Sequence, residues 1–241
     1  MNPTTTINIQ QIHTAIADKL PDYVQAVHDL PDRRDHYRGS HWLTEEEWDE
    51  AKEHTIAYND VFRAIIENNP TMRQDDIMSV VGNVAHELKF SEEEMEMIRH
   101  NTRGILFGMR HEVAFAQVLT ALPEGYRIVS TDDEDDAHGA DFKVLCPNGV
   151  VVSIDVKATE RLEEEAEKRT AYYMKKHHKK PPANQIVLYS GFDDEYDFTD
   201  DSPWHPSPMA IERVLPYVLS ELKQASEMHA ISMKKLGQVT Y

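Results

Sequence analysis

Two aspartates and a lysine, Asp141, Asp155 and Lys157, have the types and the spacing for metal-dependent chemistry. Mg²⁺ prefers hard oxygen ligands and keeps several waters, so a protein is expected to supply two or three carboxylates. A divalent ion makes water nucleophilic near neutral pH and stabilises charge on phosphoryl oxygens, as phosphodiester hydrolysis requires. Asp141 and Asp155 would bridge the ion, and the Val156 carbonyl and Glu112 (directly or through water) would fill its shell. Lys157 would orient the attacking water or offset developing charge.

A hairpin is needed to bring these groups together. Two alternating apolar runs within 139–159 are joined by Pro147-Asn148-Gly149, which predicts a three-residue loop made of a type I turn closed by a left-handed glycine. With that loop Cys146 pairs with Val150, and Asp141 lies opposite Asp155 on one face. A two-residue loop would instead send the two carboxylates to opposite faces.

The alternative interpretation of the same stretch is a solvated outer face that carries an Asp-Lys pair. The pattern acidic-x-Lys is not specific by itself, because it recurs at Glu50/Lys52, Glu87/Lys89, Asp141/Lys143, Asp155/Lys157 and Glu221/Lys223. Three of these five pairs fall in stretches with helical periodicity. Only the strand context distinguishes Asp155/Lys157.

Glu112 belongs to a helix predicted over Gly104 to Leu122, with an apolar seam at Leu106, Met109, Val113, Ala116, Leu119 and Leu122. A carboxylate at the margin of such a seam either reaches solvent or points at a positive group. A strand is predicted from Tyr126 to Thr131, before the hairpin.

The first hundred residues are predicted to be all helical. Apolar spacing indicates a helix from Ile9 to Val27 that Pro21 breaks or restarts. A capping box at 44–47 opens a helix that stops before Pro70, and a third helix covers 77–88. A second capping box at 91–94 starts a helix through Met95 and Ile98.

Downstream of the hairpin a charged helix is predicted over residues 160–178, then a buried strand from Asn184 to Ser190 and a long helix from Pro208 to Leu236. The end of the charged helix is the most basic part of the chain and is a candidate phosphate-contacting edge, although cations are also favoured at any helix C-terminus. The candidate nucleic-acid-binding residues there are Lys168, Arg169, Lys175, Lys176, Lys179 and Lys180.

Composition limits the function classes. The 241-residue chain, 40% hydrophobic and 28% charged, is long enough to bury a core without staples. Its net charge of −18 argues against a general polyanion-binding surface, so contact with nucleic acid must be local or aided by metal ions. No apolar run reaches the length of a membrane span, and the polar N-terminus and single Cys146 fit a cytoplasmic protein.

The order helix, three strands, helix, strand, with Glu112, Asp141 and Asp155-Val156-Lys157 at these positions, resembles the PD-(D/E)XK nuclease superfamily. Type II restriction enzymes, archaeal Holliday-junction resolvases and many repair nucleases share that fold. The resemblance covers roughly residues 101–191. Ala140 stands where the family motif has Pro, and Asp155 stands where Glu is commoner.

The resemblance implies an α/β protein with a restriction endonuclease-like αβββαβ core and a mixed central sheet at 101–241, preceded by a helical region at 1–100. It implies a DNA endonuclease dependent on Mg²⁺, with Mn²⁺ as a substitute, acting in restriction, repair or mobile-element defence. A homodimer is plausible because cutting two strands often uses two copies. The alternatives are a non-cleaving DNA-binding or scaffold module on the same fold, and an interaction protein whose hairpin charges are incidental.

Overall fold

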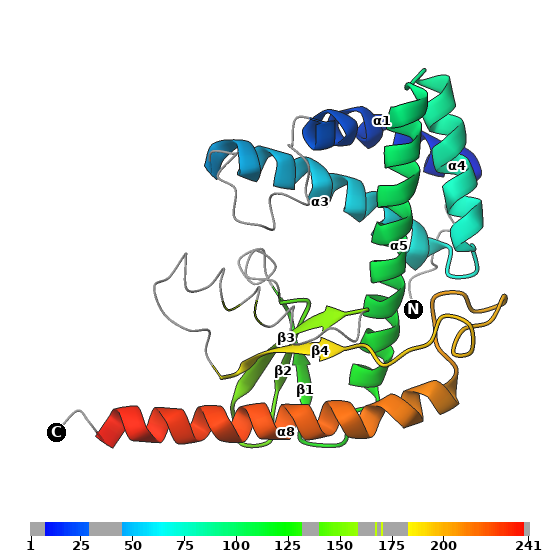
Figure 1. The fold of residues 1–241 in the computed structure, drawn as a ribbon. Coiled ribbons are helices and arrows are strands. Elements are labelled where there is room, and N and C mark those ends of the chain that lie inside the picture. The colour runs from blue at the N-terminus through cyan, green and yellow to red at the C-terminus, as the bar shows by residue number, and fades with distance from the viewer. Residues whose placement is uncertain are drawn as a thin grey trace. The chain divides into compact units, whose positions relative to one another are not determined.

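The structure, a computed structural model, describes residues 8–28, 45–131, 140–158, 167, 170 and 183–238. In these ranges the chain forms five helices and a four-stranded mixed sheet, so it is a mixed α/β protein (Figure 1). It divides into two compact units: the first runs to Met109 and includes Asp200–Pro203, and the second comprises Arg110–Thr199 and the chain from Trp204 onward. The sequence placed a boundary after residue 100.

The first unit is helical, as the apolar spacing predicted. It contains α1 (Ile9–His28), α3 (Glu45–Asn68), α4 (Gln74–Glu87) and the first part of α5 (Glu92–Thr120). Helix α1 packs on α3 and α4. Its core includes Tyr23, stacked on Tyr58 with ring centroids 4.3 Å apart.

The predicted break at Pro21 is wrong, because α1 continues through it to His28. A proline inside a helix costs about 3 kcal/mol relative to alanine. Leu20 and Val24 on either side of it are buried, and each buried side chain of this kind contributes about 1.5–3 kcal/mol. Packing of the apolar face therefore outweighs the proline.

The capping box at the start of α5 is confirmed. The Ser91 backbone N–H donates to Glu94 Oε2 at 2.7 Å, and the Glu94 N–H donates to Ser91 Oγ at 3.2 Å. These reciprocal bonds satisfy two donors that the first helical turn leaves without intrahelical acceptors. The box predicted from residues 44–47 includes side chains outside the described part.

The sequence predicted two helices between residues 91 and 122, and the structure has one, α5, from Glu92 to Thr120. An exposed helical glycine such as Gly104 costs only about 1 kcal/mol. Ile98 and Leu106 on either side of it are buried. Their packing keeps the helix continuous where the sequence pattern changes.

The second unit is built on the sheet. Its strands are β1 (Arg127–Val129), β2 (Phe142–Leu145), β3 (Val151–Lys157) and β4 (Gln185–Tyr189), in that order across the sheet. The first three are antiparallel neighbours, and β4 pairs parallel to β3. Strand β1 is shorter than predicted. The helix expected over 160–178 lies almost wholly outside the described residues.

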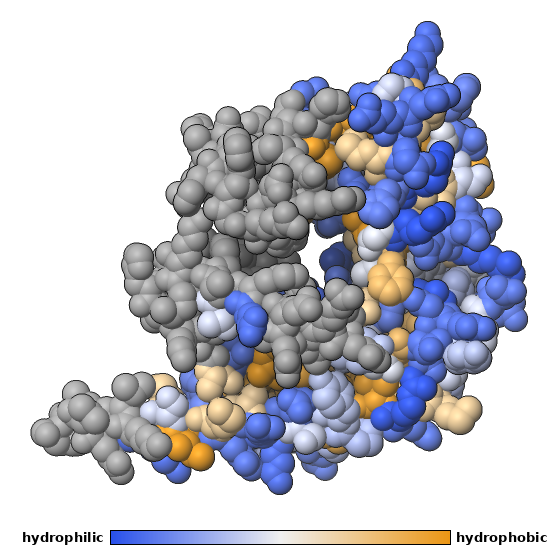
Figure 2. Space-filling view, in the orientation of Figure 1, coloured by the Kyte–Doolittle hydropathy of each residue, from blue (hydrophilic) through white to orange (hydrophobic). Residues whose placement is uncertain are grey.

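Helix α8 (Pro208–Gln238) runs along the sheet and contacts β3 and β4, and the second part of α5 completes the core (Figure 1). The predicted core side of the hairpin is confirmed, since Val144, Cys146, Val152, Ile154 and Val156 are all buried in it. The C-terminal part of α8 exposes Met228, Ile231 and Met233, and hydrophobic atoms are visible over this helix in Figure 2.

The predicted seam of α5 is confirmed at Leu106, Met109 and Leu119, which are buried, and is wrong at Val113 and Ala116. Val113 and Ala116 are only half-buried, whereas Ala114, Phe115 and Val118 are fully buried. The true buried row also contains His111, which the apolar pattern left out because it is polar. Glu112 remains beside this row and is half-buried.

Within the described ranges, no helix combines the length and the apolar character needed to cross a membrane.

Candidate active site

The hairpin has the loop and the register that the sequence predicted. The Gly149 N–H donates to the Cys146 carbonyl at 2.9 Å, and Gly149 has φ +81°, as in a type I turn closed by a left-handed glycine. The Cys146 N–H donates to the Val150 carbonyl at 2.8 Å. Phe142 pairs with Ile154. The ladder ends at this pair, and Asp141 lies at a bend just before β2, so the predicted pairing of Asp141 with Asp155 is not part of the ladder.

The Asp141 carboxylate binds the backbone of the neighbouring strand. The Val156 N–H donates to Asp141 Oδ2 at 2.6 Å, and the Asp141 backbone N–H donates to the Ile154 carbonyl at 2.9 Å. The ladder between β2 and β3 ends at Phe142, while β3 continues to Lys157. A side-chain oxygen therefore satisfies a strand N–H where the partner strand has ended.

Asp155 and Lys157 face the same side of β3, as the strand period predicted. Lys157 Nζ lies 2.8 Å from Asp155 Oδ1, and the side chains are 35% and 11% exposed. Asp155 is buried overall, at 8% of its residue surface. A buried carboxylate is costly unless a cation or hydrogen bonds compensate it, and Lys157 provides that compensation.

The negative charge of Glu112, on α5, acts on Asp141 of the hairpin. The pKa of Asp141 is raised to about 7, by burial first and then by the negative charges of Glu112 and Asp155. The hydrogen bond from Val156 and the charge of Lys157 act in the opposite direction. The four predicted groups therefore interact with one another, and the acids outnumber the one ammonium among them.

The predicted metal ligands do not form a complete cluster, and the predicted nucleic-acid contacts are not described. Among the residues described, no three Asp, Glu, His or Cys side chains are arranged so as to hold one ion. Val156, whose carbonyl was an expected ligand, pairs with Leu188 in the parallel ladder. The predicted nucleic-acid-binding residues lie outside the described part. They are Lys168, Arg169, Lys175, Lys176, Lys179 and Lys180.

A second polar cluster beside the site was not found from the sequence. His111 Nδ1 lies 2.6 Å from Ser190 Oγ, and His111 Nε2 lies 3.6 Å from Asp194 Oδ2. The Arg110 guanidinium pairs with Asp194 at 3.0 Å and lies 4.0 Å from the centroid of the Phe198 ring. His111 is 2% exposed and Ser190 has no exposed surface.

One sequence signal could have found part of this cluster. His111 precedes Ala114 by three residues and Phe115 by four, so it belongs to the same row of the helix. A polar ring in a buried row must find a hydrogen-bond partner. The identity of that partner, Ser190, follows only from the pairing of β4 with β3.

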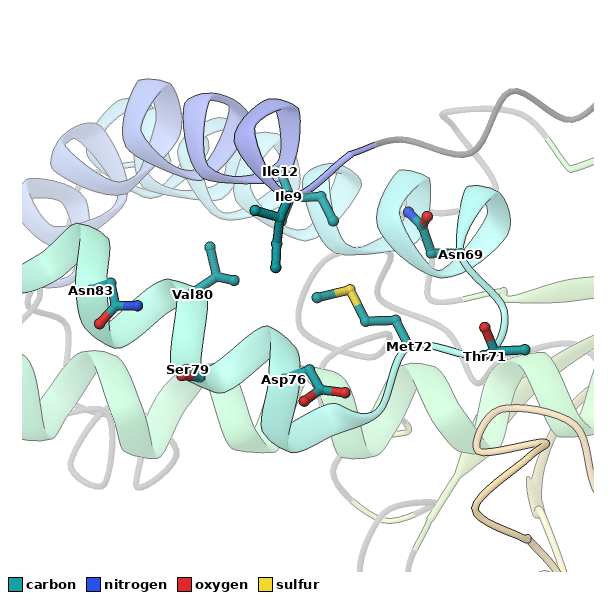
Figure 3. A pocket seen from close by; sticks show the side chains of 9 residues that line it. All are labelled: Ile9, Ile12, Asn69, Thr71, Met72, Asp76, Ser79, Val80 and Asn83. Carbon is teal, nitrogen blue, oxygen red and sulfur yellow. The ribbon is translucent and has the colours of Figure 1, made fainter.

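A separate hollow of about 430 Å³ lies in the helical unit (Figure 3). The side chains of Ile12, Met72 and Val80 point into it, and its polar rim includes Asp76 and Asn83. It contains none of the predicted site residues.

Comparison with protein-family models, with curated proteins and with solved structures finds no match for this chain.

Proposed function

We propose that this chain is a Mg²⁺-dependent DNA endonuclease with a restriction endonuclease-like core. The observation that carries the proposal is the pKa of Asp141, raised to about 7 by burial and by the charges of Glu112 and Asp155. A carboxylate whose pKa is raised by burial and by neighbouring acids is typical of a functional site.

The donors are of the chemical type that a hard divalent cation prefers. Asp141 and Asp155 offer carboxylate oxygens from the same end of the hairpin, and Glu112 offers a third from α5, close enough for its charge to act on Asp141. These three residues and the Val156 carbonyl would hold Mg²⁺ or Mn²⁺. The bound ion would lower the pKa of a coordinated water and polarise the scissile phosphate.

The remaining roles belong to the chain itself. Lys157 is held beside Asp155, where its ammonium can orient a water or offset negative charge on a phosphate. The Val156 N–H fixes the orientation of the Asp141 carboxylate through its 2.6 Å hydrogen bond. Both groups are on a strand inside the sheet, which holds them more rigidly than a loop would.

The element order also supports the core. Helix α5 is followed by the antiparallel strands β1, β2 and β3, and β4 then adds parallel to β3. A parallel pair requires a crossover connection, in agreement with the helix predicted over 160–178. That segment carries the predicted DNA-contacting lysines, which an acidic protein would need to bind a polyanion locally.

One observation favours the alternative, a non-cleaving DNA-binding or scaffold module. Asp141 already accepts from the Val156 N–H and Asp155 already pairs with Lys157, so both carboxylates have protein partners. Such partners would stabilise the hairpin in the absence of chemistry. The module would bind DNA without cutting it.

Incubation of the purified protein with supercoiled, linear, branched and single-stranded DNA, in Mg²⁺ or in EDTA, tests the proposal. We expect cleavage in Mg²⁺ and none in EDTA. Asp155→Asn and Lys157→Ala are expected to lower the cleavage rate by at least about a hundredfold while the protein stays folded. Binding in Ca²⁺ without cleavage in Mg²⁺ would favour the non-cleaving module.

The matched control is Lys223→Ala in Glu221-Leu222-Lys223, which has the same acidic-x-Lys pattern on helix α8. It is expected to cleave at the wild-type rate. Undiminished cleavage by both Asp155→Asn and Lys157→Ala would reject the assignment of the site.

A further inference from the structure

Ser190 connects two elements that carry residues of the proposed site. It directly follows β4, and its backbone N–H donates to the Lys157 carbonyl at 2.9 Å. Its hydroxyl oxygen lies 2.6 Å from His111 Nδ1. His111 immediately precedes Glu112 on α5. A single serine therefore links the end of strand β3 to the turn of α5 that carries Glu112.

A Ser-His-Asp nucleophile is excluded for this cluster by access and geometry. Ser190 has no exposed surface, so a substrate cannot reach its hydroxyl. The separation of 3.6 Å between His111 Nε2 and Asp194 Oδ2 also exceeds a hydrogen bond. The cluster must act through the residues that it holds in place.

The direction of the hydrogen bond follows from the surroundings of the ring. His111 is 2% exposed, and such burial favours the uncharged imidazole, which carries one N–H. Asp194 faces Nε2, which favours the hydrogen on that nitrogen. Nδ1 then accepts from the Ser190 hydroxyl.

The Asp194 carboxylate is held in place by an ion pair with Arg110. Its Oδ1 lies 3.0 Å from Arg110 Nη1, and the Arg110 guanidinium lies over the Phe198 ring. Arg110 and His111 are neighbours on α5, so both anchor the same helical turn against the segment after β4. The Ser190 hydroxyl at one ring nitrogen and the Asp194 charge near the other favour one orientation and one tautomer of His111.

We infer that the buried His111–Ser190 hydrogen bond is a positioning device, which fixes Glu112 on α5 relative to Lys157 at the end of β3. The inference rests on the proposed function. Neither residue touches the reacting atoms. Removal of the bond lets the two elements shift by a fraction of an ångström. Groups that hydrogen-bond a metal ligand directly are worth about 10–100-fold in metal affinity or activity, and this bond acts one residue further away, so we expect the lower end of that range.

The test compares Ser190→Ala with the wild-type protein in two measurements: Mn²⁺ affinity by titration without DNA, and the Mg²⁺ concentration at half-maximal cleavage. We expect both half-saturation concentrations to rise about tenfold. The maximal rate at saturating Mg²⁺ is expected to change less. Ser190→Cys and His111→Asn, which keep a hydrogen-bonding group near each lost atom, are expected to recover part of the affinity, and they replace Ser190→Ala if it does not fold.

Val118→Ala is the matched structural control, because Val118 is fully buried on the same row of α5 and bonds to neither residue. It is expected to lower the stability but leave the half-saturation concentrations unchanged.

Two failures are distinguishable. A wild-type protein that binds Mn²⁺ or cleaves DNA, with Ser190→Ala behaving like Val118→Ala, overturns the positioning role alone. A wild-type protein that neither binds Mn²⁺ nor cleaves overturns the proposed function and the positioning role together.

Discussion

At the scale of single residues, Asp141 combines a structural contact with an electrostatic cost. Its carboxylate satisfies the Val156 N–H at 2.6 Å, yet its pKa is raised to about 7 because it is partly buried near Glu112 and Asp155. Ionisation of Asp141 at neutral pH therefore destabilises the folded state. Sites that bind cations often carry such unfavourable charge in the free protein, at some cost in stability.

The stability of the protein is predicted to fall as the pH rises from about 4 to about 7. The pKa of Asp141 is 3.8 in its ordinary state and about 7 in the folded protein, so between these values the folded chain binds more protons than the unfolded chain. Stability decreases with pH wherever that holds, and the decrease ends above the folded pKa.

The variant Asp141→Asn removes this dependence and keeps an oxygen that can accept from the Val156 N–H. We expect it to be more stable than the wild type at about pH 8, by about 2 kcal/mol after allowance for solvent screening, and similar near pH 4. Urea denaturation at both pH values measures this. Asp201→Asn, at an exposed position, is the control. A variant less stable than the wild type at about pH 8 would contradict the argument.

At the scale of elements, the hairpin depends on its turn and helix α5 depends on its packing. Gly149 has φ +81°, a backbone conformation that costs other residues about 1 kcal/mol or more. Gly104 lies in α5 with no atom within 4 Å of an added β-carbon. The same change, glycine to alanine, should therefore have opposite effects at the two positions.

Gly149→Ala is predicted to destabilise the protein by about 1 kcal/mol, because alanine is strained at positive φ. Gly104→Ala is predicted to stabilise it by about 0.5–1 kcal/mol, since alanine loses less backbone entropy in a helix. Urea denaturation of the two variants checks the signs. Stabilisation by Gly149→Ala would contradict the conformation described for the turn, and destabilisation by Gly104→Ala would contradict the open helical environment described for Gly104.

At the scale of the molecule, the net charge of −18 sets the interactions with solvent ions and with DNA. An excess of one sign destabilises the compact state through self-repulsion, which salt screens. It also opposes a polyanion everywhere except at local cationic sites. Divalent ions would both screen the protein and occupy the proposed site.

The melting temperature is predicted to rise by several degrees between about 0.1 M and about 1 M KCl, as screening reduces the repulsion. Potassium glutamate and KCl at equal ionic strength should act alike if screening is the cause. A melting temperature that is independent of KCl would show that the charges are too far apart to repel one another.

The sequence determined what depends on neighbouring residues. Pro147-Asn148-Gly149 and the strand period were enough to predict the hairpin register and the Asp155–Lys157 pair, because a loop of known length fixes which residues are opposite. The Ser91 capping box and the end of α3 before Pro70 followed from equally local rules.

Only the tertiary structure decided what depends on residues far apart in the chain. Helices α1 and α5 stay continuous because their buried faces outweigh Pro21 and Gly104, which local propensity cannot weigh. The pKa of Asp141 depends on Glu112, and the buried ring of His111 finds its hydrogen-bond partner in Ser190, which follows strand β4. Burial and charge act through space, so these features exist only once the elements have packed.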